Sequence, residues 1–528
     1  PEALKSGLRW QAVLEEIVRS APHAAAATAL LHSDRRQLAS LQLPQYAAVA
    51  GQSLITDTDG LNLALSSELT PLQRIYSRVE RLGGRDLRDQ ILDARQIRKI
   101  RDACQNTAAL RHTAVPCCPD DFDSLVEYEI TSISSALRAV VLGREGGRLT
   151  WLAPRGEASP RPMVPVNIDV FHGSAGIALF LAANAAVRGV DADREIALEW
   201  ARQVTRRGQI DQIWSGIVHA VGERGWRGAP GVVYALSRCG TFLGDDSIAD
   251  IANRLSLRLA CSGIDDGWQD VIDGAAGSIL VMMAFYETLR AEHLLRRAYD
   301  GALALISNRY FDRFTRAHVW RIRCSGSDQQ FVGSGFAHGS SGIAAALSAV
   351  YRHVGDPRVR AAILEARQFE DTMYCADENN WFDQSPPSRA AEGNRVLMRA
   401  WCHGAVGIEL SRLLTDIDLG LTTANVEGHV SVPGRTRGAN EDTLCCGALG
   451  MTDLLLTAGE RLHRPELVAR AKAICFSVMN ERRARGRTGV TPVALASPPG
   501  LFNGSAGVGY QLLRLAAPKA VPSVLLIV

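Results

Sequence analysis

Two adjacent cysteines, Cys445 and Cys446, stand directly before a Gly-x-x-Gly turn in the segment TLCCGALG. A third thiol, Cys402, precedes a similar turn in AWCHGAVGI. The dipole of a helix that begins at such a turn favours the thiolate form of a cysteine, and the thiolate is the form that binds metals. Buried, unreactive cysteines are the alternative, but three thiols at equivalent turn positions favour ligands. Three thiolates suit tetrahedral zinc with one open position, so we expect these cysteines to hold zinc.

Zinc bound by three anionic sulfurs carries a net negative charge, which makes it a poor Lewis acid for splitting water. It is better suited to holding a fourth sulfur as a nucleophilic thiolate. Lowering the pKa of a substrate thiol from about 8.5 to below neutral would keep it ionised while bound. The expected chemistry is therefore addition of a thiol to a carbon electrophile rather than hydrolysis.

Conjugate addition of a thiolate produces an enolate that must be protonated, so an acid is required nearby. His338, before the turn in HGSSGI, is the candidate; its alternative role is to cap a helix. Asp273 could hold or charge a histidine or deprotonate the incoming thiol, and it could also act as a helix N-cap. Arg399, three residues before Cys402, could stabilise the enolate oxygen.

The turns belong to a repeat in which Gly-x-x-Gly is followed by an apolar helical stretch. Successive turns are 43 to 65 residues apart, which leaves room for two helices in each repeat. The segments between turns, such as 193–206 and 357–371, have apolar residues at helical spacing, whereas those after turns are apolar nearly all round. The first glycines of the turns are Gly173, Gly228, Gly274, Gly339, Gly404, Gly447 and Gly504.

Alternating amphipathic and apolar helices predict an all-α fold, an α/α toroid of seven inner and seven outer helices. An open solenoid is the alternative, but it would leave one face of the apolar helices wet. Glycines would allow the inner helices to crowd together at their starts. The residue before each turn then faces the axis, and all seven are polar or thiol-bearing: His172, Arg227, Asp273, His338, His403, Cys446 and Asn503.

Bulk properties exclude several classes of protein. The net charge of +2 gives no electrostatic argument for binding nucleic acid or anionic lipid. The apolar run near 177–187 is too short to cross a membrane, and the chain opens on no secretion signal. We therefore expect a cytoplasmic protein with reduced thiols. Residues 1–115 lack the repeat and are expected to form a helical extension, and residues 120–528 form the ring domain.

The repeat and its cysteines resemble the lanthionine synthetase cyclases, specifically the bifunctional class II (LanM-type) lanthipeptide synthetases. The resemblance covers about residues 120–528 and rests on AWCHGAVGI, TLCCGALG, FAHGSSGI, DVIDGAAG and LFNGSAGVGY. It implies an axial zinc that activates a cysteine of a precursor peptide, which attacks dehydroalanine or dehydrobutyrine to close lanthionine or methyllanthionine rings. Carried over by position, Cys402, Cys445 and Cys446 are the ligands, His338 is the acid–base residue and Asp273 its partner.

Residues 1 to about 110 look like the last part of the dehydratase domain that precedes the cyclase in that class. The resemblance implies two partners: a precursor peptide with a leader and a dehydrated core, and the rest of a dehydratase. ATP and Mg²⁺ would serve only that dehydratase part, whose catalytic residues this sequence does not contain. The chain departs from many relatives in having Cys446 where they have a histidine ligand. Met398 stands where they often have a basic residue.

Three other functions compete with this one. An α/α-toroid glycosidase needs paired carboxylates and aromatic sugar platforms, but aromatic residues are only 6% of the sequence. A zinc thiol-alkylating transferase of the prenyltransferase type would require a tunnel lined by aromatic residues. A non-catalytic peptide- or thiol-binding toroid with structural zinc would need four protein ligands, and His403 is the one fourth candidate near the three cysteines.

Overall fold

The computed structural model divides into two compact units, residues 1–92 and 93–528. In the first unit, three short strands form an antiparallel sheet in the order β1-β2-β3: β1 Tyr46–Ala48, β2 Leu54–Asp57 and β3 Asn62–Ala64. This sheet was not expected, because strands of three or four residues are too short to show an alternating pattern. Most of the helical extension expected over residues 1–115, and the domain boundary expected at 115–120, lie outside the described residues. The structure describes residues 46–48, 54–57, 62–64, 95, 98, 121–143, 149–154, 163–206, 208–259, 268–323, 329–382, 397–421, 442–488 and 497–527.

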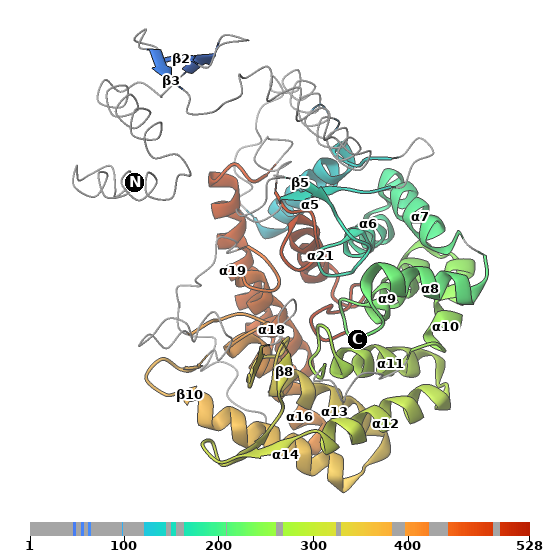
Figure 1. Cartoon of the computed structure of the whole chain (residues 1–528), viewed down its shortest axis with the longest axis vertical. Helices are drawn as coiled ribbons and strands as arrows, with labels where there is room; N and C mark the ends of the chain where they lie inside the picture. Colours follow the sequence, from blue (N-terminus) through green and yellow to red (C-terminus); the bar gives the residue numbers. More distant parts are fainter. Residues whose placement is uncertain are drawn as a thin grey trace. The chain divides into compact units, whose positions relative to one another are not determined.

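The second unit contains a closed ring of inner helices, each beginning directly after the first glycine of a Gly-x-x-Gly turn (Figure 1). Neighbouring helices of the ring contact one another in chain order, and the last contacts the first. This closure confirms the toroid and rules out an open solenoid. The inner helices are α6 Ser174–Arg188, α9 Ala229–Leu243, α11 Ala275–Leu289, α13 Ser340–Val354, α16 Ala405–Leu419, α18 Ala448–Arg461 and α21 Ser505–Ala516.

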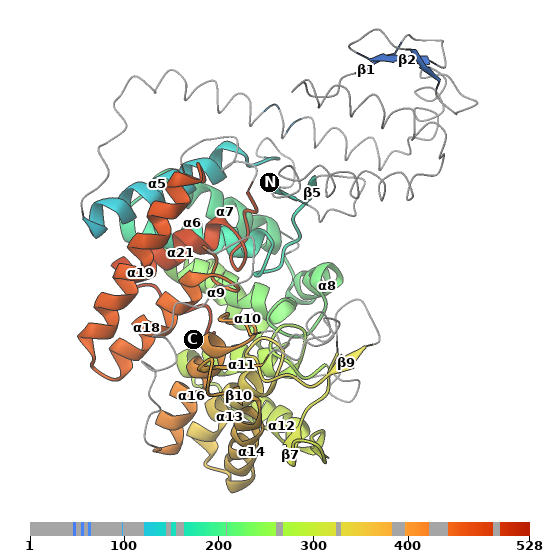
Figure 2. The same ribbon diagram turned by 90° about the vertical axis from the view of Figure 1, so that its left-hand side faces the viewer.

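An outer layer of amphipathic helices covers the inner ring. Each outer helix packs on the inner helix that precedes it, except α5, which comes first in the ring and packs on α21. Figure 2 shows α5 beside α19, which it contacts. The expected outer partner of α16 falls within 422–441, outside the described residues. The described outer helices are α5 Phe122–Ala139, α7 Asp191–Thr205, α10 Asp246–Ser256, α12 Glu292–Ser307, α14 Pro357–Met373 and α19 Pro465–Ala484; α8 Ile210–Val221 is an additional helix that packs on α7, α9 and α10.

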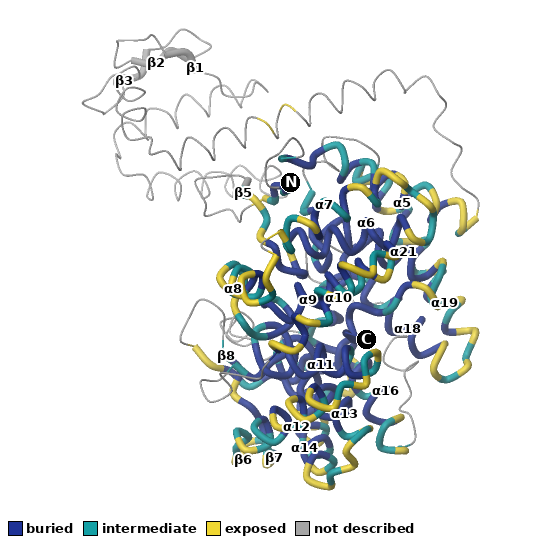
Figure 3. The backbone as a smooth tube through the Cα atoms, turned by 90° about the vertical axis from the view of Figure 1, so that its right-hand side faces the viewer, coloured by how far each residue is buried: buried dark blue, intermediate teal, exposed yellow. Residues whose placement is uncertain are grey.

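Short antiparallel hairpins interrupt the connections between helices. The strand pairs are β4 Leu152–Pro154 with β5 Met163–Pro165, β6 Tyr310–Asp312 with β7 Ala317–Val319, β8 Ile322–Arg323 with β9 Gln330–Phe331, and β10 Tyr374–Cys375 with β11 Asn380–Trp381. The inner helices are buried along nearly their whole length, and exposed residues gather on helices such as α8 and α19 (Figure 3). Among the described helices, none has the length and apolar character that a membrane span requires.

The second glycine of every turn lies where no side chain fits. A Cβ atom there would lie only 1.6 to 2.4 Å from the carbonyl oxygen of a residue five or six positions earlier. At Gly176, Gly231, Gly277, Gly342, Gly407 and Gly507, it would also lie within 3.2 Å of the neighbouring turn. The glycines therefore allow each turn to fold tightly on itself and to touch the next.

Backbone hydrogen bonds join the turns directly. The amide of Trp226 donates to the carbonyl of Val271 (2.9 Å), and the amide of Val271 donates to Ala337 (3.2 Å). On the other side of the ring, bonds of 2.9 to 3.0 Å run from Trp401 to Cys445, from Cys445 to Phe502 and from Phe502 to Phe171. Adjacent inner helices are thus held at their N-terminal ends by main-chain contacts.

The segment after α21 runs into the centre of the ring, where Figure 1 places the C-terminus. The Trp401 indole nitrogen donates a hydrogen bond to the carbonyl of Leu525 (3.1 Å), and the Tyr510 hydroxyl donates to the carbonyl of Pro522 (3.0 Å). Leu525 and Leu526 are buried. This segment therefore fills the ring behind the turns.

The crowding at the second glycine predicts that Gly342→Ala destabilises the ring. The new Cβ would lie 1.9 Å from the Phe336 oxygen and 2.5 Å from Val271 Cγ2, so overpacking should cost about 2 kcal/mol or more of unfolding free energy. Gly355→Ala is the matched control, because nothing lies within 4 Å of that position and its φ of +68° adds only about 1 kcal/mol of strain. Urea unfolding followed by circular dichroism measures both. Equal stability of the two variants would contradict the crowding argument.

Candidate metal and acid–base site

Three thiols meet at the N-terminal ends of two adjacent inner helices. Cys402 precedes α16, and Cys445 and Cys446 precede α18. The Sγ atom of Cys446 lies 3.6 Å from that of Cys402 and 3.5 Å from that of Cys445, and all three sulfurs lie within 4.8 Å of one another. Cys402 and Cys445 are buried, and Cys446 is half-buried. The structure thus brings together the three cysteines that the sequence nominated as ligands.

The spacing of the sulfurs fits a tetrahedral metal ion. Zinc–sulfur bonds of about 2.3 Å place two sulfurs of a tetrahedron roughly 3.8 Å apart, close to the 3.5 and 3.6 Å observed. The hydrogen bond from the Cys445 amide to Phe502 and the bond from Trp401 to Cys445 hold the backbone of the two turns. The three residues therefore fit a zinc ion without rearrangement of the main chain.

The pKa values of Cys445 and Cys446 are shifted in opposite directions. Hydrogen bonds with Cys402 and Cys445, helped by the charges of His403 and His172, lower the pKa of Cys446 to about 3. Hydrogen bonds with Cys402 and Cys446, together with burial, raise the pKa of Cys445 well above its usual range. By contrast, burial alone raises the pKa of the isolated Cys239 thiol. The surroundings of Cys446 therefore favour its thiolate form.

A cluster of aromatic rings is formed by residues of the same turns as the thiols. Phe171 and Phe502 are stacked with centroids 4.3 Å apart, and Trp401 lies 5.1 Å from Phe502 and 5.4 Å from Phe336. Trp401, Phe336 and Phe502 are fully buried. Trp401 directly precedes Cys402, and the Phe502 carbonyl accepts a hydrogen bond from the Cys445 amide, so these apolar rings belong to the same turns as the thiols.

His338 is held by a carboxylate that the sequence analysis did not nominate. Its Nδ1 lies 2.5 Å from Oδ2 of Asp270, which is only 2% exposed. Burial opposes the charged imidazolium, but the hydrogen bond and charge of Asp270, with a contribution from Asp273, raise the pKa of His338 above its ordinary value. The result is a histidine that stays protonated at higher pH than a free one.

The residues that directly precede the seven turns form the rim of the ring. Asp273, the expected partner of His338, forms an ion pair at 2.7 Å with Arg227, the rim residue of the preceding turn. Its amide donates to Oδ1 of Asp270 (2.9 Å), so the two aspartates belong to one turn. The repeat marks Asp270 as a turn residue, because Asp169 stands at the same place in the first turn, where Oδ1 accepts from the amides of Phe171 and His172. The repeat does not show that Asp270, rather than Asp273, contacts His338.

His403, His172 and Arg399 also have contacts at the turns or next to them. The His403 ring stacks on His338 with centroids 5.7 Å apart, and so links it to Cys402 along the chain. His172 lies 3.4 Å from the Asn503 amide nitrogen. Arg399 is buried and donates to the carbonyl of Glu378 (2.9 Å). Thiols and imidazoles thus lie at the same end of the ring, and the Arg399 guanidinium binds the Glu378 carbonyl.

A sequence profile of one family, described as lanthionine synthetase C-like protein, matches residues 164–526. That span is more than half of the chain. The chain belongs to this family. As a lanthionine synthetase C-like protein, it is a peptide thioether cyclase, an enzyme that forms carbon–sulfur bonds. No curated protein matches the sequence significantly.

Solved structures with related folds were also compared with this lanthionine synthetase C-like protein. A structure titled nisin cyclase is 14% identical, with a TM-score of 0.46, and the match covers 68% of this chain and 92% of that one. The unsaturated glucuronyl hydrolase of Bacillus sp. GL1 is 11% identical, with a TM-score of 0.38, 76% of this chain covered and 97% of the hydrolase. Because both TM-scores are below 0.5, neither likeness bears on activity.

The contact between His338 and Asp270 predicts a change in proton affinity. Asp270→Asn removes the charge that outweighs burial, so the pKa of His338 should fall below its value in the parent protein. The pH dependence of acylation of His338 by diethyl pyrocarbonate, followed by mass spectrometry of the peptide that contains it, measures the shift. Asp169→Asn is the matched control in the equivalent turn. An unchanged His338 pKa in Asp270→Asn would contradict the assigned contact.

Proposed function

We propose that this cyclase is zinc-dependent and adds cysteine thiolates of a precursor peptide to dehydroalanine or dehydrobutyrine, giving lanthionine or methyllanthionine. The observation that carries the proposal is the meeting of three thiols with a histidine–aspartate pair at one end of the ring. The thiols supply a site for a soft metal ion and the pair supplies an acid. Both are needed when a thiol adds to an activated alkene.

Cys402, Cys445 and Cys446 would hold the zinc ion. When bound, the ion would supply an electrophilic centre that lowers the pKa of a peptide cysteine thiol. The protein supplies the surroundings for this step. Buried aromatic rings belong to the same turns as the thiols, and the charges of His403 and His172 lower the pKa of Cys446.

His338 would protonate the α-carbon of the enolate that forms as the sulfur attacks the β-carbon. Its Nδ1 is held by Asp270, which leaves Nε2 as the nitrogen available to donate the proton. Asp270 would fix the ring orientation and stabilise the cation before transfer. The thiol loses one proton and the carbon gains one, so the histidine can recover its proton from the next thiol and the reaction needs no other reagent.

Two further residues would act on the substrate. Arg399, buried and anchored by the Glu378 carbonyl, would stabilise the enolate oxygen. Asp273 would assist in removing the proton of the incoming thiol, with Arg227 keeping its carboxylate charged.

We further propose that residues 1–115 are the end of a class II dehydratase domain. The remainder of that domain would use ATP and Mg²⁺ to prepare the peptide.

Removing one ligand should abolish both metal binding and cyclisation. Zinc content per chain and closure of a dehydrated peptide with one free cysteine are measured for the parent and for Cys445→Ala. We expect about one zinc per chain in the parent, and loss of both zinc and closure in the variant. Cys239→Ala is the control, because Cys239 is buried on α9 away from the cluster. Stoichiometric zinc in the parent without faster closure would favour a binding toroid with structural zinc.

The all-sulfur ligand set predicts a more reactive bound thiolate than a set that includes histidine. Cys446→His should keep zinc but slow closure, because a neutral imidazole gives the metal less electron density than a thiolate. Rates of ring closure and the pattern of rings, read by tandem mass spectrometry, test this expectation. Closure as fast as in the parent, with the same rings, would refute it.

A further inference from the structure

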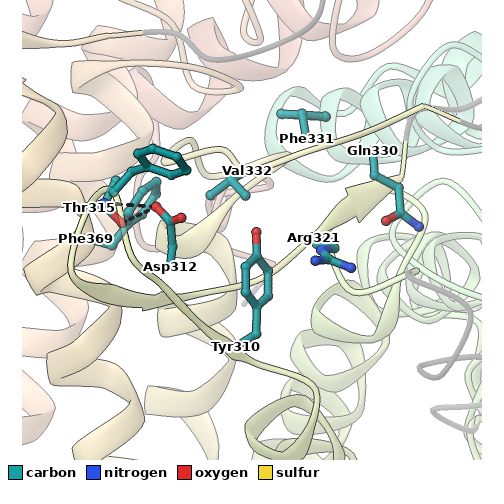
Figure 4. Close-up of a pocket in the computed structure, with 9 residues that line it drawn as sticks. Tyr310, Asp312, Thr315, Arg321, Gln330, Phe331, Val332 and Phe369 are labelled. Carbon is teal, nitrogen blue, oxygen red and sulfur yellow. Dashed lines mark hydrogen bonds between the residues drawn. The ribbon is translucent and has the colours of Figure 1, made fainter.

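A basic and aromatic hairpin projects from the connection between α12 and α13. It comprises residues 308–323 and contains β6, β7 and β8; β8 pairs with β9, which comes after it in the chain. Between these strand pairs lies a pocket of about 480 Å³. Figure 4 shows the Tyr310 hydroxyl pointing toward Val332, with Asp312 on one side and Arg321 on the other. The pocket is large enough to take a side chain with part of its backbone.

The hairpin is anchored firmly on the ring domain. Ala317 and Val319 of β7 are buried in a small apolar cluster with Phe369 of α14 and Trp381 of β11. Glu365 of α14 also binds the hairpin, through an ion pair with Arg309 at 2.7 Å and a contact with His318 at 3.3 Å. One face of the hairpin is therefore fixed, and its other face is presented to solvent in a defined geometry.

The tip exposes apolar surface that this fixed fold does not require. Phe314, a pocket residue, is 99% exposed, and Phe311 is 54% exposed. Phe331 and Phe369 supply the apolar wall of the same pocket. Exposed aromatic residues around a pocket are typical of surfaces that bind a partner.

The hairpin carries a strong local positive charge, although the whole chain has a net charge of only +2. Residues 308–323 include five arginines and one aspartate. Among the described residues, no carboxylate lies within ion-pair distance of Arg313, Arg316 or Arg321. The Arg321 guanidinium lies 4.4 Å from the centre of the Tyr310 ring. Such arginines can bind a carboxylate through paired hydrogen bonds.

One strand on the pocket wall leads along the chain to the turn that carries His338. Phe331 and Val332, on its wall, lead directly into Gly333, whose carbonyl accepts a hydrogen bond from the Ser340 amide at 2.9 Å. Ser334 forms an antiparallel bridge with Gly339, so the turn that carries His338 follows this strand closely in the chain. A chain bound in the pocket would therefore be anchored six residues along the backbone from the acid–base histidine.

We propose that the hairpin and its pocket bind an acidic segment of the precursor peptide, outside the residues that react. A carboxylate of that segment would pair with Arg321, and its neighbours would face Arg313 and Arg316, while an apolar side chain enters the pocket against Phe331 and Phe369. This inference rests on the proposed function, because it takes a peptide as substrate. Nucleic acid is disfavoured, because the net charge of +2 gives the chain as a whole little attraction for a polyanion.

The test uses two synthetic peptides that share a core with one dehydroalanine and one cysteine. One has an N-terminal extension rich in glutamate and leucine, and the other has glutamine in place of every glutamate. Fluorescence anisotropy gives the Kd of each peptide for the zinc-loaded parent and for Arg313→Ser/Arg316→Ser. The parent should prefer the acidic peptide by about five- to tenfold, and the variant should lose that preference. Arg202→Ser, an exposed arginine on α7, should keep it.

Closure of the bare core peptide separates this inference from the proposed function. If the parent fails to cyclise the core, the proposed function is wrong. If the core is cyclised equally by parent and variant while the variant still prefers the acidic peptide, the hairpin does not bind it. Equal Kd values for the two peptides in the parent also overturn the inference. Displacement of the peptide by an oligonucleotide at lower concentration would assign the hairpin to nucleic acid instead.

Discussion

The close approach of the seven turns to one another is the constraint on which the rest of the structure depends. Each second glycine lies against a carbonyl of its own turn, and most also lie against the turn before it. Main-chain hydrogen bonds then tie several of the turns together. Residues placed before the turns are therefore positioned by backbone contacts rather than by flexible loops. Chemistry that requires several side chains at fixed distances can be built on such a rim.

The rim combines groups whose charges support one another. Helix N-termini and imidazoles favour negative sulfur at one part of the ring, and two aspartates favour a positive imidazole at the next. The stacked His338 and His403 rings lie between these two regions. A thiolate and a proton donor can thus persist near each other without neutralising one another, because each is stabilised by different neighbours. That separation is what addition of a thiol to an alkene demands of an active site.

Much of this arrangement could be predicted from the sequence, because it repeats. The spacing of the glycine turns indicates the toroid, and the position of Cys402, Cys445 and Cys446 relative to those turns indicates that their sulfurs converge. Asp270 could not be chosen over Asp273 in the same way. Both lie in one turn, and only the three-dimensional path of that turn decides which carboxylate reaches the histidine of the next. The hairpin at 308–323 escaped prediction because strands of two or three residues leave no readable period.

The segment after α21, which lies inside the ring, affects how the protein folds during its synthesis. The indole of Trp401, next to a metal-ligand candidate, is bonded to Leu525, and the first outer helix of the ring packs on the last inner one. Trp401, beside the thiol cluster, therefore lacks this hydrogen bond until Leu525 has been synthesised. Contacts between such distant parts of a chain form slowly. A nascent chain would expose these cysteines to solvent for as long as its C-terminal segment is unfinished.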